Sequence, residues 1–170
     1  MTNKTVVFHH IPKTAGTTFY SILKKQYTEL ERFHIDGLNP AVSLESFKKL
    51  DNRTRDNYKL VYGHLADKFI PFIQNEVVYI VFLRDPIDHF LSSFYYIQRA
   101  ESNRFYEEVK KMTLENFIEM RLEKNLDNLQ TRHLSGDTDF LLDANREPAD
   151  FKTLGEYFYL KAMNKLESVN

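Results

Sequence analysis

Residues 12–18, with the sequence Pro-Lys-Thr-Ala-Gly-Thr-Thr, bring a lysine, three threonines and two small residues together. Ala15 and Gly16 let the backbone come close to a ligand, and the threonines supply hydroxyl and amide donors. Lys13 adds a full positive charge. An apolar run precedes this stretch and a helical pattern follows it, and the first turn of a helix attracts anions. The residues therefore predict an anion-binding site, with an ordinary turn carrying a surface lysine as the alternative.

The order of these residues differs from that of the Walker A motif, G-x-x-x-x-G-K-[ST], in which the lysine follows the last glycine. Here Lys13 precedes Gly16. The stretch is therefore predicted to be an anion-binding turn of another kind.

Two further residues capable of chemistry follow apolar runs. His64 follows residues 58–62, and its imidazole can accept a proton near neutral pH. Arg84 follows residues 77–83, and a guanidinium binds phosphate oxygens well. A structural histidine is the alternative for His64, and a local ion pair with Asp85 is the alternative for Arg84.

The segment after Arg84 is typical of a second phosphate site. Pro86 suits the first turn of a helix, and Ser92 lies two turns into that helix. A packing role is the alternative for Ser92.

Three apolar, β-branched runs at residues 5–8, 58–62 and 77–83 predict three strands. The unbroken run at 77–83 suits a strand that is covered on both faces. Helical patterns lie between and after these runs, and parallel strands need such crossovers. The sequence therefore predicts an α/β fold with a central parallel sheet flanked by helices.

Ligands of such sheets collect at the carboxyl ends of the strands. Lys13, His64 and Arg84 each follow one strand, so these three residues are expected to converge.

Amphipathic patterns predict the helices. The apolar positions of the first helix run from Phe19 to Leu30, and they include Ile22. Ser43 and Thr113 are expected to cap two later helices, the second with Ile118 on its apolar side. The remaining expectations are a loop at 31–40, a solvated connection at 51–56, a partly helical segment at 101–111, an anchored polar segment at 125–136 that stops at Gly136, a loop at 137–150 and a helix at 154–166.

The length of 170 residues predicts one domain, 1–170, with a sizeable core. The 23 basic and 24 acidic residues give a formal charge of -1, so no nucleic-acid partner is expected. The sequence has no cysteine, which excludes disulfides, thiolate metal sites and cysteine nucleophiles. No apolar run approaches the length of a membrane span, so a soluble, cytoplasmic protein is expected.

Three segments of the chain resemble parts of one enzyme family. Residues 10–19 look like the 5′-phosphosulfate loop of the sulfotransferases that use 3′-phosphoadenosine 5′-phosphosulfate (PAPS). Residues 84–86, together with Ser92 and the aromatic residues 94–96, look like their 3′-phosphate motif, and residues 128–134 are similar to a third segment. The likeness is strongest to the carbohydrate branch, which includes the heparan sulfate 2-O- and 6-O-sulfotransferases and bacterial homologues.

This resemblance implies a three-layer, P-loop-like fold and the transfer of a sulfuryl group from PAPS to a carbohydrate or another hydroxyl-bearing acceptor. 3′-Phosphoadenosine 5′-phosphate (PAP) is the implied second product, and no metal ion is required. Lys13 and His64 are the implied catalytic residues, the first at the leaving oxygens and the second as the base. The residues implied to bind the donor are Pro12, Lys13, Thr14, Ala15, Gly16, Thr17, Thr18, Arg84 and Ser92.

The resemblance gives further residues less definite roles. Tyr95 or Tyr96 would pack near the nucleotide or in the core. Asn128, Gln130 and Arg132 would line the acceptor, close over the cofactor or stabilise their own loop. Neither the acceptor nor the oligomeric state can be predicted from the sequence.

Two features depart from the family pattern. His89 stands three positions after Pro86, where the family commonly has an arginine, and a neutral imidazole there weakens a phosphate contact or makes it pH-dependent. The chain stops at Asn170, where relatives continue into a further strand, so the domain is expected to lack a C-terminal strand.

Two other functions stay open at this point. A small nucleotide kinase would use Asp85 to hold magnesium, although the position of Lys13 argues against it. A degenerate sulfotransferase domain would bind PAPS or PAP without transferring sulfate.

Overall fold

The computed structural model describes residues 3–120, 128–136, 138 and 164. The chain divides into two compact units, one formed by residues 1–83 with 130–170 and the other by residues 84–129. The predicted helix at 154–166 and the predicted loop at 137–150 lie almost wholly outside the described residues. Among the described residues, none of the helices has the length and apolar character that crossing a bilayer requires.

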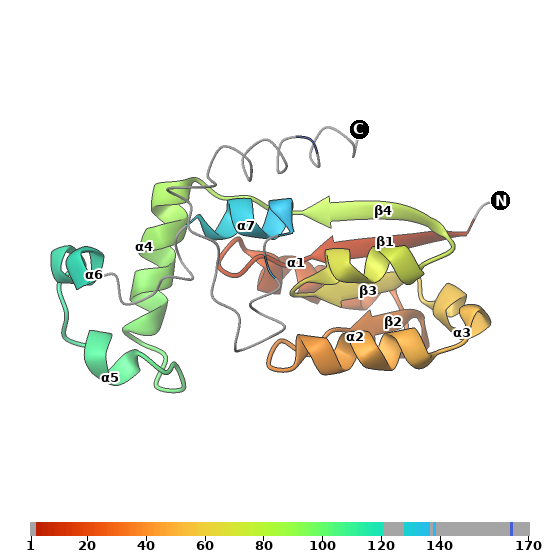
Figure 1. Ribbon diagram of the computed structural model, residues 1–170, viewed down its shortest axis with the longest axis horizontal. Coiled ribbons are helices and arrows are strands. Elements are labelled where there is room, and N and C mark those ends of the chain that lie inside the picture. The colour runs from red at the N-terminus through yellow and green to blue at the C-terminus, as the bar shows by residue number, and fades with distance from the viewer. Residues whose placement is uncertain (1–2, 121–127, 137, 139–163, 165–170) are drawn as a thin grey trace. The chain divides into compact units, whose positions relative to one another are not determined.

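The first unit is built on one sheet with the strand order β2-β3-β1-β4. Its strands are β1 (Lys4–His9), β2 (Arg32–His34), β3 (Leu60–Gly63) and β4 (Glu76–Val81). All three pairings are parallel, and Val7 of β1 pairs with Val61 on one side and Tyr79 on the other. The arrows in Figure 1 accordingly run in the same direction. The expected central parallel sheet is confirmed.

Most helical elements of this unit connect consecutive strands, as parallel pairing demands, while the last helix follows β4. They are α1 (Gly16–Gln26), η1 (Glu29–Glu31), α2 (Pro40–Lys49), α3 (Asn52–Asn57), η2 (Ala66–Phe72) and α7 (Leu129–Ser135). Two of them, η1 and η2, are 3₁₀ helices.

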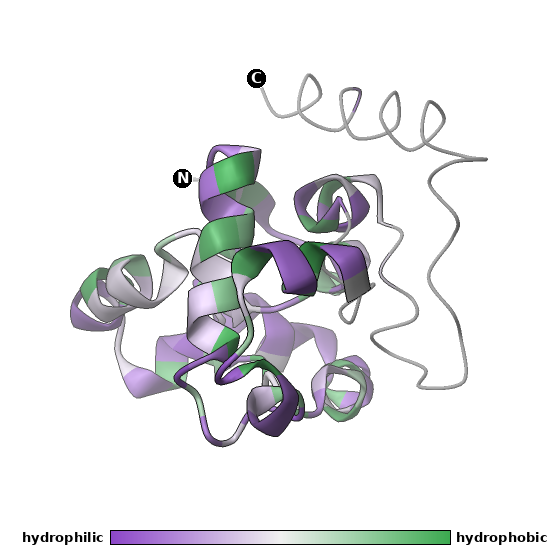
Figure 2. Cartoon of the chain, turned by 90° about the vertical axis from the view of Figure 1, so that its left-hand side faces the viewer, coloured by the Kyte–Doolittle hydropathy of each residue, from purple (hydrophilic) through white to green (hydrophobic). Residues whose placement is uncertain are grey.

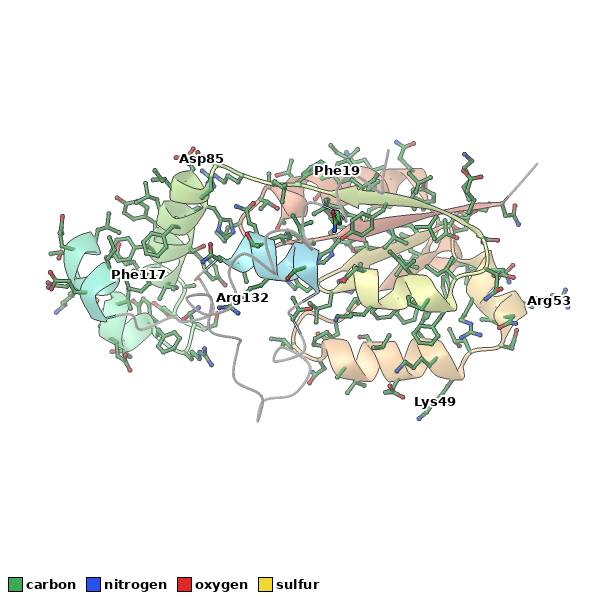
Figure 3. The ribbon with its side chains drawn as sticks, turned by 45° about the horizontal axis from the view of Figure 1, so that its top comes forward. Phe19, Lys49, Arg53, Asp85, Phe117 and Arg132 are labelled. Carbon is green, nitrogen blue, oxygen red and sulfur yellow. The ribbon has the colours of Figure 1, made fainter. Side chains whose placement is uncertain are left out.

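One face of the sheet packs against α2 and η2. Val7 and Val61 belong to a buried cluster with Phe47 of α2 and Phe69 of η2. The Phe47 and Phe69 rings meet edge to face at 5.3 Å. Figure 3 shows Lys49 and Arg53, from the neighbouring α2 and α3, pointing away from this core.

The opposite face packs against α1. Phe8 and Leu60, which neighbour Val7 and Val61 in sequence, join a second buried cluster with Leu23 of α1. Side chains alternate across a strand, so one sheet supports two cores. The helices therefore flank the sheet on both faces, which confirms the three-layer arrangement.

Several expectations about the elements of this unit are wrong. Arg32–His34 was expected in a loop, but it forms β2 beside β3. Residues 51–56 are exposed or half-buried, as a solvated connection requires, and most of them form the short helix α3, which Asp51 caps by accepting from the Thr54 amide at 2.8 Å. Ser43 lies inside α2, which begins at Pro40 because proline suits a first turn.

The expected burial differs at other positions. Ile22 and Leu30 are 53% and 87% exposed, since α1 ends at Gln26 and only one side of it covers the sheet. The strand β4 was expected to be covered on both faces, but it is the edge strand and Val78 is 37% exposed. Ile118, in the second unit, is 54% exposed rather than buried.

The second unit contains α4 (Pro86–Ile97), α5 (Tyr106–Val109) and α6 (Leu114–Met120). Its core is a buried cluster of Phe94, Ile97, Val109 and Phe117. The helices carry hydrophobic segments next to hydrophilic ones, as amphipathic helices do (Figure 2). Asp85 caps α4 by accepting from the amides of Ile87 and Asp88 at 2.9 and 3.1 Å.

Candidate active site

The turn between β1 and α1 has an unusual backbone. Lys13 and Ala15 both have φ of 66°, in the left-handed region that residues other than glycine normally avoid. Ala15 is the N-cap residue of α1, and no side chain caps the helix there. Left-handed residues in a turn direct backbone N–H groups into one concavity, and the start of α1 adds its partial positive charge. The geometry suits an anion.

The three threonines of this turn differ in their surroundings. The Thr14 side chain is buried, and its hydroxyl donates to the carbonyl of Ile11 at 2.8 Å. Thr17 and Thr18 are exposed at the start of α1. Thr14 therefore stabilises the turn itself, while the exposed threonines have hydroxyls that a ligand can reach.

His64 follows β3 and reaches the neighbouring strand end. Its Nδ1 atom lies 2.6 Å from the carbonyl oxygen of His10, which directly follows β1. A carbonyl only accepts, so Nδ1 carries the proton and Nε2 keeps a lone pair in the neutral ring. Burial lowers the pKa of His64 below 6.5, and the hydrogen bond to His10 only partly opposes this. His64 is therefore prepared to accept a proton at Nε2 near neutral pH.

The His10 ring stacks on the His64 ring, with centroids 4.8 Å apart and planes at 21°. Burial, followed by the nearby His64, lowers the pKa of His10 to about 4. A Cβ atom at Gly16 would overlap with the His10 ring. The glycine at the start of α1 is thus what lets the two imidazoles stack beside the turn.

A pocket opens next to these histidines at the carboxyl ends of the strands. Its lining comes from four parts of the chain: the ends of the strands β1 and β3, the start of α1 and the segment that includes the end of β2. The lining residues are Phe8, His10, Thr17, Tyr20, His34, Ile35, Gly37, Tyr62, Gly63 and His64.

Behind the turn, a group of buried polar side chains anchors the end of β1. The Nε2 atom of His9 lies 2.8 Å from Nδ1 of His133 in α7, and its Nδ1 lies 2.7 Å from the Tyr79 hydroxyl. The Asp67 carboxylate is 3.3 Å from His9 Nδ1. Burial raises the pKa of Tyr79, and the charge of Asp67 adds to this. These contacts connect β1 with β4, η2 and α7 directly beneath the candidate site.

Comparison with protein-family models places this chain in a known group. The model described as "Sulfotransferase family" matches residues 2–153, which is most of the chain. The chain belongs to the sulfotransferase family. Curated proteins and solved structures were also compared with it, and neither comparison found a match.

Membership of the sulfotransferase family assigns sulfuryl transfer as the general chemistry. The family generally uses PAPS as the donor and releases PAP, and its acceptors bear hydroxyl groups. Among the described residues of this sulfotransferase, no group of three or more His, Cys, Asp or Glu side chains is placed to hold a metal ion.

The sulfotransferase brings two of its three predicted strand-end residues to one edge of the sheet. Lys13 follows β1 and His64 follows β3, and these strands are parallel neighbours. The strand β4 is also a parallel neighbour of β1. Arg84, which follows β4, is however the first residue of the second unit. The convergence of Arg84 with Lys13 and His64 stays a prediction.

Within the second unit, the residues of the predicted 3′-phosphate motif run from just before α4 to near its end. Arg84 is exposed and Ser92 is half-buried. His89 is only 4% exposed, and its carbonyl accepts from the Ser93 hydroxyl at 2.9 Å. Tyr95 and Tyr96 are 49% and 44% exposed, so neither is a core residue of this unit.

The third predicted segment forms the helix α7. Asn128 precedes it with a left-handed φ of 52°, and Gly136 follows with φ of 78°, which confirms the expected stop. Arg132 is 2% exposed, and Gln130 is half-buried. Their roles toward a ligand stay predictions.

Several residues of the pocket carry no recognisable signal in the sequence. His34 and Gly37 lie in and after β2, a strand too short to show a period, so no sequence signal distinguished them. Tyr20 received no role from the sequence, and Tyr62 was only part of a predicted strand. His10 was part of the quoted motif, but its contact with His64 depends on the strand order.

Proposed function

We propose that this chain transfers a sulfuryl group from PAPS to the hydroxyl group of an acceptor, and that the acceptor is a carbohydrate. The hydrogen bond from His64 to the His10 carbonyl is the observation that carries the proposal. It supports the proposal because it defines the tautomer of His64, the residue that would act as the base beside the turn. Family membership and the resemblance to the carbohydrate branch support the choice of donor and acceptor.

The turn after β1 would hold the 5′-phosphosulfate group. Backbone amides at the left-handed turn and the exposed hydroxyls of Thr17 and Thr18 would face its oxygens. Lys13 would neutralise the charge that grows on the phosphate oxygen as the bond to sulfur breaks. These hydrogen-bond donors fit a tetrahedral anion. PAPS itself supplies the activated sulfuryl group.

His64 would act as the general base. Its Nε2 would take the proton of the acceptor hydroxyl while that oxygen forms a bond to sulfur. The bond between sulfur and the 5′-phosphate oxygen breaks, and PAP leaves with the electron pair. The proton on His64 is later lost to solvent, so the residue returns to its starting state.

Arg84 and Ser92 would bind the 3′-phosphate, which distinguishes PAPS from ATP. The buried position of His89 bears on this site, because it makes a direct phosphate contact through that imidazole costly. We therefore assign the charge recognition to Arg84 rather than to His89.

A thermal-shift titration tests the donor assignment. PAP in the presence of a chelator should raise the melting temperature more than magnesium-ATP does. A larger shift with magnesium-ATP would favour the nucleotide kinase instead. Binding of PAP without sulfate transfer to any hydroxyl acceptor of a broad panel would favour a degenerate, non-catalytic domain.

A further inference from the structure

We propose that the pocket beside His64 receives an uncharged acceptor through a single ring, and that Tyr20, Tyr62 and His34 select it. This inference rests on the proposed function, because it concerns the acceptor of the same reaction. It departs from the polyanionic chains that the heparan sulfate resemblance would suggest.

The rings of the selecting residues lie nearly parallel. Tyr20 and Tyr62 stack with centroids 4.3 Å apart and planes at 24°. The His34 ring stacks on the Tyr62 ring with centroids 4.8 Å apart, and the planes of the His34 and Tyr20 rings are nearly parallel, at 7°. Aromatic side chains supply a rigid, apolar contact surface with polar edges, which suits the flat or C–H-rich faces of a ring.

The two tyrosine hydroxyls add hydrogen-bonding capacity to this surface. They lie 2.6 Å apart, so one donates to the other. The second hydroxyl proton is then directed to another acceptor, and the oxygens can accept from a ligand hydroxyl. A sugar or a phenol offers both kinds of partner.

The lining of the pocket carries no formal charge near neutral pH. Among the described residues, those that line it include no Asp, Glu, Lys or Arg. Burial lowers the pKa of His10, His34 and His64, so these rings are largely neutral. Burial also raises the pKa of Tyr62, and the hydrogen bond with Tyr20 adds to this. A carboxylate or sulfate on the acceptor would lose its hydration here without gaining a partner ion.

The charges nearest to the rim oppose each other. The Lys24 ammonium lies 4.4 Å from the centre of the Tyr20 ring, and it lowers the pKa of His34. Asp36 acts on His34 in the opposite direction. Arg32 acts on Tyr62 as a second cation, so Lys24 and Arg32 face one anion, Asp36, around the pocket. None of these three charges lines the pocket itself.

The size of the pocket limits what enters it. Its volume is about 110 Å³, somewhat below the roughly 150 Å³ of a cavity that holds benzene. One ring therefore enters in part, with its hydroxyl toward His64, while longer acceptors extend into solvent.

Two matched pairs of acceptors test the inference. Methyl β-glucoside and phenol are uncharged, and methyl β-glucuronide and 4-hydroxybenzoate add a carboxylate to each ring. Initial rates of sulfate transfer from PAPS are measured for all four, with PAP binding to the same preparation measured by calorimetry. We expect kcat/KM for the neutral member to exceed that of its carboxylate by at least tenfold.

Two variants connect this preference to the pocket. Tyr20→Phe keeps the ring but removes the paired hydroxyl, and it should raise KM for the neutral acceptor several-fold without changing PAP binding. His34→Lys adds a cation at the rim and should shift the preference toward the carboxylates. Gln26→Lys adds the same charge to an exposed position of α1 outside the pocket lining, and it should leave the preference unchanged.

The outcomes separate this inference from the function on which it rests. A protein that fails to bind PAP would refute the proposed function. A protein that binds PAP but prefers the carboxylates, or that sulfates other acceptors of a broad panel but none of the four rings, would overturn the inference about the acceptor alone. An unchanged preference in His34→Lys would also overturn the selecting role of these rings.

Discussion

The Nδ1 atom of His64 lies 2.6 Å from the carbonyl oxygen of His10, a residue 54 positions earlier in the chain. Strand pairing explains this contact, because His9 at the end of β1 is in register with Gly63 at the end of β3. The residues that follow the two strands therefore meet. One hydrogen bond thus sets the tautomer of the predicted base.

Removal of the His64 imidazole should lower kcat far more than donor affinity. We expect His64→Ala to lose roughly 100- to 10,000-fold in kcat, the usual contribution of a positioned base. The Kd for PAP should stay within a few-fold of the parent value. A matching loss of PAP affinity would make His64 a binding residue. Gln26→Ala, at an exposed position of α1 outside the pocket lining, serves as the control for nonspecific effects on kcat.

The pH dependence of transfer should follow the lowered pKa of His64. The base works only when its ring is neutral, so activity is present above its pKa and is lost as the pH falls through it. Since burial lowers that pKa below 6.5, kcat/KM at pH 6.5 should exceed half of its plateau value. A profile of kcat/KM with a stable donor and a neutral acceptor checks this. An inflection clearly above pH 6.5 would contradict the assignment.

Lys13 should be required for transfer but not for folding. Lys13→Ala should lower kcat/KM by at least roughly 100- to 1,000-fold, since a charge at the leaving oxygens acts mainly in the transition state. Alanine meets the same left-handed backbone as lysine, so the melting temperature should change little. Lys25→Ala, at the exposed last turn of α1, removes an equal charge away from the turn and should keep full activity. Near-normal turnover of Lys13→Ala would remove the central assignment of the mechanism.

Two glycines should tolerate alanine to different degrees. Gly16→Ala places a methyl group on the His10 ring and should displace it from His64, with a large loss of kcat. The methyl group added by Gly37→Ala approaches only the edge of the His64 ring, at 3.1 Å from Cδ2, and should cause a smaller loss of kcat. Turnover and melting temperatures of both variants provide the check. If Gly16→Ala kept as high a turnover as an active Gly37→Ala variant, the histidine stack would not be needed for catalysis.

The buried contact between His9 and His133 should stabilise the first unit. The two side chains are 0% and 1% exposed, and their ring nitrogens lie 2.8 Å apart. His133→Ala should lower the free energy of unfolding by about 1–3 kcal/mol, since a buried polar group loses a partner. Urea unfolding measures this change.

A double variant distinguishes the hydrogen bond from simple packing. The combination His9→Leu with His133→Leu should lose less free energy of unfolding than the sum of the two single leucine variants, because no orphaned imidazole is left. Strict additivity would indicate that the two rings do not interact.

Part of the fold and of the site could be predicted from local patterns. The β-branched runs before residues 9, 63 and 82 identified three strands, because buried parallel strands need unbroken apolar residues. The position of Lys13 between a strand and a helix followed in the same way. The short strand β2 carries too few residues to show a period, and its pairing with β3 forms it.

The sequence by itself determined which residues could do the chemistry and which local elements would carry them. Periodicity and residue type act over a few positions, and they suffice for a strand, a turn and a helix. Only the tertiary structure decided that the His10 carbonyl would orient His64 and that His34, Tyr20 and Tyr62 would share one pocket. These contacts depend on the order β2-β3-β1-β4, which burial and pairing across the whole sheet select and no local pattern encodes.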